Sequence, residues 1–395
     1  MRFLFCTARA TQLSEISVAV CEDAREIGNL ADDWQGLIQD SIAAVFTSPY
    51  WYLAALDAFP VQQLALITAR AAGRLVGVLL LARIRTDARG LYFSRVTPPA
   101  AGDYQPLVAD PEVAETAVPM ILDAALDHFG RHGVYWLPNI PSDHPSLRHV
   151  RAFLTNRQMP FVEEKEIGFR LRIDGADFAT IQKQWPAGHR KDVRRQQKRL
   201  SEQGSLSIWE PETFSQAEPV LEEFFRVHDQ KWLSQGFPGM FQNSANRRHF
   251  HALLKRLWRR GLHFSTLRCG SVDVSFHFGF FSGGWLQWYR PSYRHEFGGY
   301  SPGKIHVSML VERACELKWR GFDFLLGAEP YKALWCNEKV EVTSIHAGFH
   351  SWTPSFFWFS RGKPFVRSRF QLAYFRARAW RQRVFQRGPE PKRDQ

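Results

Sequence analysis

Short apolar runs, some alternating with polar residues and some continuous, are interleaved along the chain with amphipathic stretches. This succession predicts a mixed α/β fold, because alternation favours strands and a repeat of about 3.6 residues favours helices. In the first half, the predicted strands are Ile16–Cys21, Gln63–Ala69, Leu75–Ile84 and Val134–Leu137, and the predicted helices are Asp23–Asp40, Ser48–Phe59, Val113–Phe129 and Leu147–Asn156.

The same order of elements returns in the second half. Its predicted strands are Leu206–Trp209, Leu262–Arg268, Val272–Phe281, Trp285–Arg290 and Phe322–Leu326, and its predicted helices are Phe214–Trp232, Ala245–Arg260 and Lys304–Trp319. Both halves follow the order β-α-α-β-β-β-α-β, although their residues show no visible repeat. We therefore predict a tandem duplication of one fold. The expected domains are residues 1–157 and 158–350, joined near Arg157–Arg172 and followed by a tail at 351–395.

The composition supports this class of protein. The chain has 395 residues, of which 45% are hydrophobic, enough for two buried cores and too many for global disorder. Its five cysteines are scattered and form no metal-ligand or disulfide pattern, so we expect reduced thiols and no metal. The N-terminus lacks an export signal, and no apolar run of about 20 residues occurs, so we expect a cytoplasmic protein.

A net charge of +12 points to a polyanionic partner, which could be nucleic acid, an anionic membrane or a phosphate-bearing small molecule. Part of this charge lies in Gly188–Leu200, where helical spacing would place six cations on one broad face. These cations either recognise phosphate or simply form a solvated face. They make up two neighbouring rows, Arg190, Arg194 and Lys198 beside Lys191, Arg195 and Arg199.

The tail from Val366 to Gly388 alternates arginine with aromatic residues. As a helix it could bind an anionic membrane surface, which would place the protein at the inner face of the membrane. The alternatives are a helix docked on the second domain with its arginines exposed, and a disordered basic tail.

The strongest candidate for chemistry is the segment Tyr289–Trp335, which predicts a strand, a glycine-containing loop, a helix and another strand. Bare backbone N–H groups of such a loop can bind a pyrophosphate, helped by the helix dipole and by Lys304. The alternative is an ordinary helix start, with Ser301 as its cap and Pro302 in its first turn.

This segment contains YSPGK and ERACELKWRGFDFLLGAEPYKALW, and both closely resemble the signature of the CelD-like acetyltransferases. That group of the GNAT superfamily is associated with bacterial polysaccharide production. Further similar stretches are FFRVHDQKW, GHRKDVRRQQKRL, FTSPYWYLAALDAF and AGDYQPLVAD, so the resemblance extends to about residue 350. The chain is also similar to the Fem-type aminoacyltransferases, which carry two tandem GNAT-like domains.

The resemblance implies a GNAT-type N- or O-acyltransferase. Such an enzyme would move an acyl group from acyl-CoA to an amine or hydroxyl of a sugar or a cell-envelope or exopolysaccharide precursor. The Fem-type relatives imply an alternative donor, aminoacyl-tRNA. A third reading is a non-catalytic GNAT scaffold that binds membrane or nucleic acid through its basic segments.

Four side chains near the end of this block are candidate catalytic groups. Tyr331 lies where many GNAT enzymes carry a general acid for the departing thiolate. Glu329 is the candidate general base or acceptor-orienting carboxylate, Lys332 the candidate for stabilising charge, and Asp323 a carboxylate that alternates toward the cleft. The alternatives are a surface ion pair for Glu329 and Lys332, a packing aromatic for Tyr331 and a structural carboxylate for Asp323.

The remaining candidates bind the two substrates. His228 and Trp232 lie at i, i+4 on one predicted helix and would contact the acceptor together with Arg190 and Arg194, unless they only pack helices. The first domain lacks a glycine-rich loop at the corresponding place, so we expect it to have lost donor binding and to help form the acceptor cleft. The expected acyl-CoA contacts are Tyr289, Arg290, Gly299, Tyr300, Ser301, Gly303 and Lys304.

Overall fold

A computed structural model describes residues 15–88, 91–234 and 236–349 of the chain. Within these ranges, thirteen strands form one mixed sheet in the order β1-β2-β3-β4-β6-β13-β7-β12-β11-β10-β9-β8, with β5 added beside β3. The predicted mixed α/β class is confirmed. The predicted tail helix at Val366–Gly388 lies outside the described residues.

The first half of the sheet carries five helices. Its elements are β1 (Ile16–Cys21), α1 (Arg25–Asn29), α2 (Ala31–Ile38), α3 (Pro49–Leu56), β2 (Gln63–Ala71), β3 (Arg74–Ala88), β4 (Leu91–Thr97), β5 (Val108–Ala109), α4 (Ala114–Phe129), β6 (Val134–Pro141), α5 (Pro145–Asn156) and β7 (Phe161–Arg172). The single helix expected at Asp23–Asp40 is wrong, because α1 ends at Asn29 and α2 begins at Ala31.

The second half repeats this order. Its elements are α6 (Phe178–Gln184), α7 (Ala187–Ser201), β8 (Leu206–Trp209), α8 (Phe214–Leu233), the 3-10 turn η1 (Met240–Gln242), α9 (Ser244–Leu257), β9 (Leu262–Cys269), β10 (Val272–Ser282), β11 (Trp285–Tyr293), η2 (His295–Tyr300), α10 (Pro302–Glu316), β12 (Gly321–Leu326), η3 (Lys332–Leu334) and β13 (Glu338–Ala347).

Local sequence sets the helix starts. The Ser48 side chain accepts a hydrogen bond from the Trp51 N–H, and Pro49 occupies the first turn of α3. Thr213 and Gln216 form a reciprocal capping box at the start of α8. No helix in the described part of the chain has the length and apolar character needed to cross a membrane.

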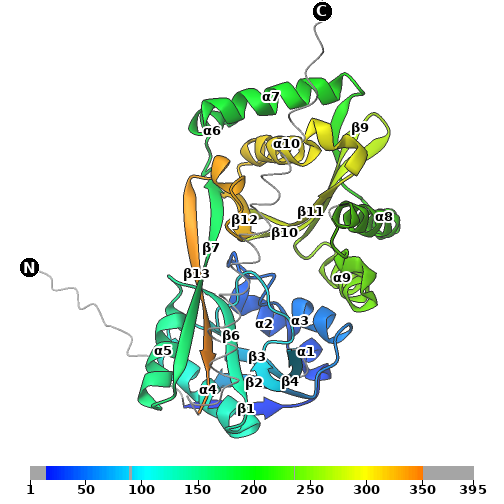
Figure 1. Ribbon diagram of the computed structural model, residues 1–395. Coiled ribbons are helices and arrows are strands. Elements are labelled where there is room, and N and C mark those ends of the chain that lie inside the picture. The colour runs from blue at the N-terminus through cyan, green and yellow to red at the C-terminus, as the bar shows by residue number, and fades with distance from the viewer. Residues whose placement is uncertain (1–14, 89–90, 235, 350–395) are drawn as a thin grey trace, which may run out of the picture.

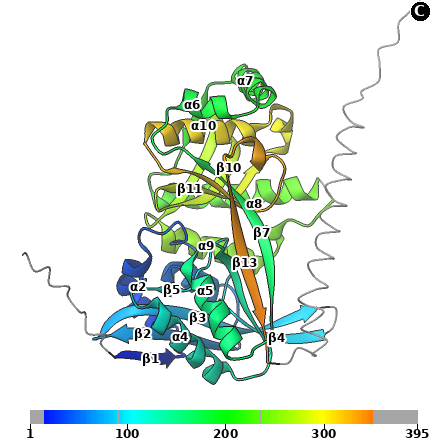
Figure 2. The same cartoon turned by 90° about the vertical axis from the view of Figure 1, so that its left-hand side faces the viewer.

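The two halves exchange their last strands. In the first half β4 and β6 pair in parallel, and in the second half β11 and β12 do the same. However, β7 pairs with β12 of the second half, while β13 returns to pair with β6 of the first. The two exchanged strands also pair with each other. Figures 1 and 2 show β7 and β13 running between the two halves, which makes the sheet continuous.

This exchange explains why the expected junction at Arg157–Arg172 is a strand. The segment Phe161–Arg172 is β7, a central strand of the sheet, and it has partners on both of its edges. The order of elements expected for a duplicated fold is confirmed. In the first half, β4 is the third of the three consecutive strands that the expected order β-α-α-β-β-β-α-β places before the last helix. The domain bounds themselves stay predictions.

A shared core joins the halves on one face of the sheet. It contains residues of α1 to α3 from the first half and of α8, α9 and β10 from the second. The ring of Phe46 lies 5.6 Å from that of Phe280, and the Trp51 ring lies 5.7 Å from that of His249. The opposite face has separate cores under α4 and α5 and under α6, α7 and α10.

Truncating Phe280 should destabilise the whole molecule. Phe280 is fully buried and contacts both Phe46 and Trp51 across the junction. We expect Phe280→Ala to lower the free energy of unfolding by about 3–5 kcal/mol, because the cavity removes contacts from both halves. Urea denaturation measures this, with the exposed Leu317→Ala as a control expected to change stability by less than about 0.5 kcal/mol. Equal effects of the two substitutions would contradict a shared core.

Candidate active site at the split between β11 and β12

The two parallel strands of the second half separate before they end. Their partnered positions are Trp285 with Gly321, Leu286 with Phe322, and Gln287 with Asp323. Beyond the last pair, β11 continues to Tyr293 and β12 to Leu326 without pairing to each other. On that side β11 therefore presents backbone groups that an extended ligand could use.

Side chains cause this separation because they form hydrogen bonds with the backbone groups of β12. Leu325 has a left-handed conformation with φ of 58°, and its N–H donates to Asp323 Oδ1 at 2.7 Å. The Leu326 N–H donates to Asp103 Oδ2 at 3.1 Å, and Lys332 Nζ donates to the Leu326 carbonyl at 2.6 Å. Because these groups are already satisfied, β12 cannot continue its ladder with β11.

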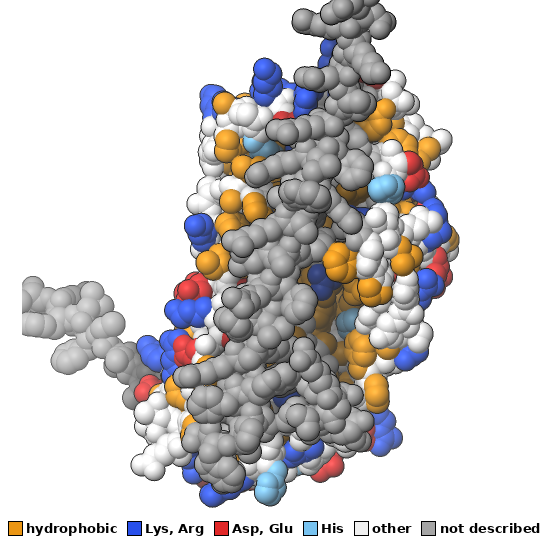
Figure 3. Space-filling view, in the orientation of Figure 1, with side chains coloured by type: hydrophobic (Ala, Val, Ile, Leu, Met, Phe, Trp, Pro, Cys, Tyr) orange, Lys and Arg blue, Asp and Glu red, His pale blue; other side chains and the backbone are white. Residues whose placement is uncertain are grey.

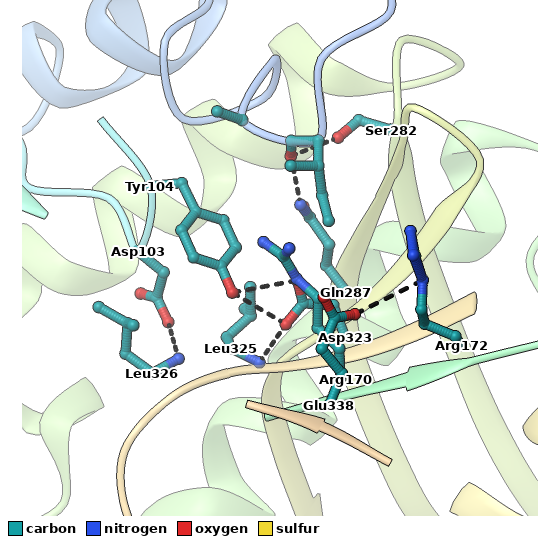
Figure 4. Close-up of polar contacts among 12 residues, drawn as sticks. Asp103, Tyr104, Arg170, Arg172, Ser282, Gln287, Asp323, Leu325, Leu326 and Glu338 are labelled. Atoms are coloured by element: carbon teal, nitrogen blue, oxygen red, sulfur yellow. Dashed lines mark hydrogen bonds and ion pairs between the residues drawn. The ribbon is translucent and has the colours of Figure 1, made fainter. Parts of the chain in front are cut away.

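Asp323 is buried at this point. Its carboxylate accepts from the Tyr104 hydroxyl at 3.0 Å and from Arg170 Nε at 2.7 Å, as well as from Leu325 (Figure 4). Burial, followed by the charge of Asp323, raises the pKa of Tyr104 well above its ordinary value, so the phenol stays a proton donor. These contacts support a structural carboxylate, and the catalytic role proposed for Asp323 stays a prediction.

The other catalytic candidates follow β12 directly. Lys332 is buried and pairs with Glu329 Oε2 at 2.9 Å, which makes this ion pair only partly exposed. The ring of Tyr331 lies 6.4 Å from that of Phe324, and 42% of its surface is exposed. Around its hydroxyl, burial and the nearby Glu329 carboxylate raise the pKa of Tyr331. A phenol that keeps its proton in this way suits the general acid role, which stays a prediction.

The glycine-containing loop forms η2 and leads into α10. Ser301 is the N-cap residue of α10 and has a φ of 53°, and Pro302 occupies the first turn, as the alternative of an ordinary helix start requires. The Ser301 side chain makes no hydrogen bond to the described first turn, so it does not cap the helix. A Cβ placed at Gly299 would meet no described atom within 4 Å, and one at Gly303 would meet only the Tyr293 ring at 3.8 Å. The space beside this helix start is therefore free of described atoms, as an anion site requires.

Helix α7 supports the loop from outside. Arg199 donates to the Gly299 carbonyl at 3.3 Å, and its guanidinium lies 5.2 Å from the centre of the Tyr300 ring. Lys304 forms an ion pair with Asp192 of α7. Lys304 therefore already has one anionic partner, and its proposed contact with a phosphate stays a prediction.

The two candidates on β11 differ in environment. The half-buried Tyr289 packs into the shared core, with its ring 5.1 Å from Phe280 and 5.9 Å from Phe46. Arg290 is exposed, and its guanidinium lies 4.4 Å from the centre of the Tyr289 ring. The exposure of Arg290 suits a ligand contact better than the packing of Tyr289, and the acyl-CoA contacts of both residues stay predictions.

His228 and Trp232 share a face of α8, as their spacing predicts. Trp232 Nε1 donates to His228 Nε2 at 3.1 Å, and the His228 ring lies 4.9 Å from that of Phe241. Burial lowers the pKa of His228 to about 4, so this imidazole is neutral near pH 7. These contacts support the helix-packing alternative, and a role in acceptor binding stays a prediction.

The basic segment forms helix α7, and its cations differ in their contacts. Arg190 donates to the carbonyls of Gln182 and Lys183 at 3.3 and 3.0 Å, which satisfies the end of α6. Arg194 contacts the Gln182 side chain at 3.5 Å and is otherwise exposed. Lys and Arg side chains gather at the end of the molecule where Figure 1 places α6 and α7 (Figure 3).

The residues predicted from the sequence do not include a layer of buried histidines under α10. His306 of α10 is bonded to Ser265 of β9 at 3.2 Å and to Ser275 of β10 at 3.1 Å, and His277 stacks on Trp288 at 4.1 Å. Burial lowers the pKa of His306 to about 3 and that of His277 well below its ordinary value. Both are therefore neutral, and the hydrogen bonds of His306 tie α10 to β9 and β10. For His277 the available signal was the alternation of polar residues within the apolar strand β10.

The first half has a corresponding split, but its own chain fills it. The pairing of β4 with β6 includes only Arg95 with Val134 and Val96 with Tyr135. Further along β6, the Asn139 side chain donates to the Gly102 carbonyl at 2.7 Å. The backbone carbonyl of Asn139 accepts from the Gln105 N–H at 2.9 Å. The segment Gly102–Gln105 therefore lies against the end of β6. This supports the expectation that the first half has lost donor binding.

The neutral histidines predict how stability depends on pH. Between pH 6.5 and about 3, His306 binds a proton in the unfolded chain but not in the folded one, so stability falls as pH falls through this range. We expect His306→Gln to reduce the slope of unfolding free energy below pH 6.5 by up to about 1.4 kcal/mol per pH unit. Urea titrations at several pH values measure it. An unchanged slope would show that His306 is protonated in the fold.

Lys332 should contribute to stability without any substrate. Its ammonium is the buried donor to the Leu326 carbonyl, so we expect Lys332→Met to lower the unfolding free energy by about 1–3 kcal/mol. The exposed Lys339→Met is the matched control and should change it by less than about 0.5 kcal/mol. A stable but inactive Lys332→Met protein would instead indicate a purely catalytic lysine.

Comparisons with known proteins agree with this geometry. Residues 187–333 match the acetyltransferase (GNAT) domain family. No curated protein matches the chain. The crystal structure of FemX superposes with a TM-score of 0.56 at 11% identity, covering 83% of this chain and 96% of that one. A conserved protein of unknown function from Bacteroides thetaiotaomicron gives 0.51 at 11% identity, covering 84% and 100%.

At these identities the two structures show a shared fold and nothing about substrates. The domain match is general, and membership of the CelD-like group stays a prediction. Residues 187–333 include the split, the open loop and α10, which are the features that the geometry singled out. Residues 187–333 are therefore similar to GNAT acetyltransferase domains, and the chain shares its overall fold with FemX.

Proposed function

We propose that this protein transfers an acyl group from acyl-CoA to an amine or hydroxyl of a sugar or of a cell-envelope or exopolysaccharide precursor. The observation that carries the proposal is the pairing of β11 with β12, which stops at Gln287 and Asp323 beside the open helix start of α10. The sequence resemblance supports the acceptor class, and the GNAT domain match supports the reaction.

The arrangement suits an extended thioester. The free edge of β11 after Gln287 can hydrogen-bond the pantetheine arm, and the open start of α10 near Gly303 can receive the diphosphate. A β11 N–H is then available to the carbonyl oxygen as negative charge develops on it. The acceptor attacks the carbonyl carbon and the C–S bond breaks. Tyr331 gives its proton to the departing thiolate, and Glu329 takes the acceptor's proton.

A second candidate is transfer of an aminoacyl group from tRNA. The exposed cations of α7 favour this reading, because they form a basic surface next to the glycine-containing loop. These cations are Lys191, Arg194, Arg195 and Lys198. This reading makes tRNA the donor and leaves the direct attack on the carbonyl unchanged. A membrane contact through the tail is compatible with either donor.

Blocking the start of α10 tests the proposed donor site. We expect Gly303→Trp to abolish binding of acetyl-CoA in calorimetry, because the indole fills the space that the diphosphate needs. Gly28→Trp, on α1, is the control, since its Cβ also meets no described atom within 4 Å but lies in the first half. Binding of acetyl-CoA that survives Gly303→Trp would contradict the proposed donor site.

The acyl donor is identified by comparing radiolabelled acetyl-CoA with charged tRNA. Saturable binding of acetyl-CoA by the intact protein supports the leading proposal. Binding of charged tRNA that falls steeply with salt, with no binding of acetyl-CoA, would replace it with the aminoacyl reading.

A further inference from the structure

We propose that the first half of the molecule acts as a clamp that fixes the point where β11 and β12 part, with Tyr104 as a positioning residue for the donor thioester. The inference rests on the proposed function for its catalytic consequence. Its structural basis is that residues of the first half contact both members of the last strand pair, Gln287 and Asp323.

The β12 side of the clamp is built by two consecutive residues. Tyr104 donates its hydroxyl hydrogen bond to Asp323, the last paired residue, at 3.0 Å. Asp103 accepts from the N–H of Leu326, at the end of the strand, at 3.1 Å. These two contacts bracket Leu325, whose left-handed φ of 58° lies just beyond the last residue of β12 that pairs with β11. The first half thus holds the bend at both of its ends.

The β11 side is held at the same level. The side chain of Gln287, which is fully buried, donates to the Ile42 carbonyl of the first half at 2.6 Å. Ser282, in the preceding strand, donates to the same carbonyl at 2.9 Å (Figure 4). Both strands are therefore fastened to the first half at the position where their pairing stops.

The segment that carries Asp103 and Tyr104 is itself held in place. Asn139 bonds to Gly102 and Gln105 on either side of the two contact residues, so the segment that fills the first split cannot slide. Gly168 of β7 leaves room for the contact, since a Cβ there would lie 3.4 Å from the Tyr104 hydroxyl oxygen and 3.1 Å from the Leu325 carbonyl oxygen. The filled split of one half thereby supports the open split of the other.

Loss of the Tyr104 hydroxyl should loosen this point selectively. Asp323 would keep Arg170 and the Leu325 N–H, so the chain can still fold, but Asp323 would lose its hydrogen bond to the first half. A looser bend allows β12 to move toward β11 and narrows the place for the pantetheine arm. The phosphate-binding loop, which is held by α7, would not change.

The test compares two buried tyrosines. Tyr104→Phe removes the contact with Asp323, whereas Tyr135→Phe removes a hydrogen bond of similar kind, to the Gly130 carbonyl at 2.6 Å, within the first half. Hydrogen exchange of the intact protein without ligand reports on the clamp directly. We expect faster exchange at Leu325 and Leu326 in Tyr104→Phe but not in Tyr135→Phe.

Ligand binding reports on the consequence. We expect Tyr104→Phe to weaken binding of coenzyme A about tenfold, which corresponds to about 1.4 kcal/mol. Adenosine 3′-phosphate 5′-diphosphate, which keeps the diphosphate but lacks the pantetheine arm, should bind as to the wild type. Equal loss for both ligands would mean general destabilisation and would overturn the positioning role. Unchanged exchange at Leu325 and Leu326 would overturn the clamp.

These outcomes separate the clamp from the proposed function. A wild-type protein that binds neither ligand would remove the acyl-CoA proposal, while the exchange data would still decide whether the first half holds β12. Normal exchange and normal binding of coenzyme A in Tyr104→Phe would retain the donor site and reject the clamp.

Discussion

Two parallel strands can separate inside a sheet only where their backbone groups find other partners, because a buried unpaired N–H or C=O is costly. Here side chains supply those partners. Asp323 and Asp103 accept from the N–H groups of Leu325 and Leu326, and Lys332 donates to the Leu326 carbonyl. β12 can therefore end near β11 without pairing to it. The open edge of β11, and with it the proposed donor site, depends on this substitution of side chains for a strand.

Replacing strand partners with side chains requires a carboxylate with no exposed surface, that of Asp323. Such a buried charge is tolerated only when it is paired. Arg170 on the exchanged strand β7 supplies the opposite charge, and Tyr104 adds a neutral donor whose raised pKa keeps its proton in place. The three residues come from both halves of the chain and from the strand between them. Strand exchange is therefore what makes the local geometry of the split possible.

The two halves of the repeated fold differ at corresponding places. In the first half, the segment around Asp103 and Tyr104 lies against β6 and occupies the place that a ligand would need. In the second half, the corresponding space near Gly299 and Gly303 is open. A shared core on one face of the sheet, where Phe46 meets Phe280, keeps the two halves in a fixed relation. One copy can thus support the site of the other.

Local pattern alone determined much of this protein: the α/β class, the repeated order of elements, the helix of Gly188–Leu200 and the glycine loop before α10. It also determined that His228 and Trp232 meet, since residues four apart on a helix are neighbours. Only the tertiary structure decided that β7 and β13 change places and that Asp323 is held by Tyr104 and Arg170. Those contacts join residues far apart in sequence, and no local spacing encodes such partners.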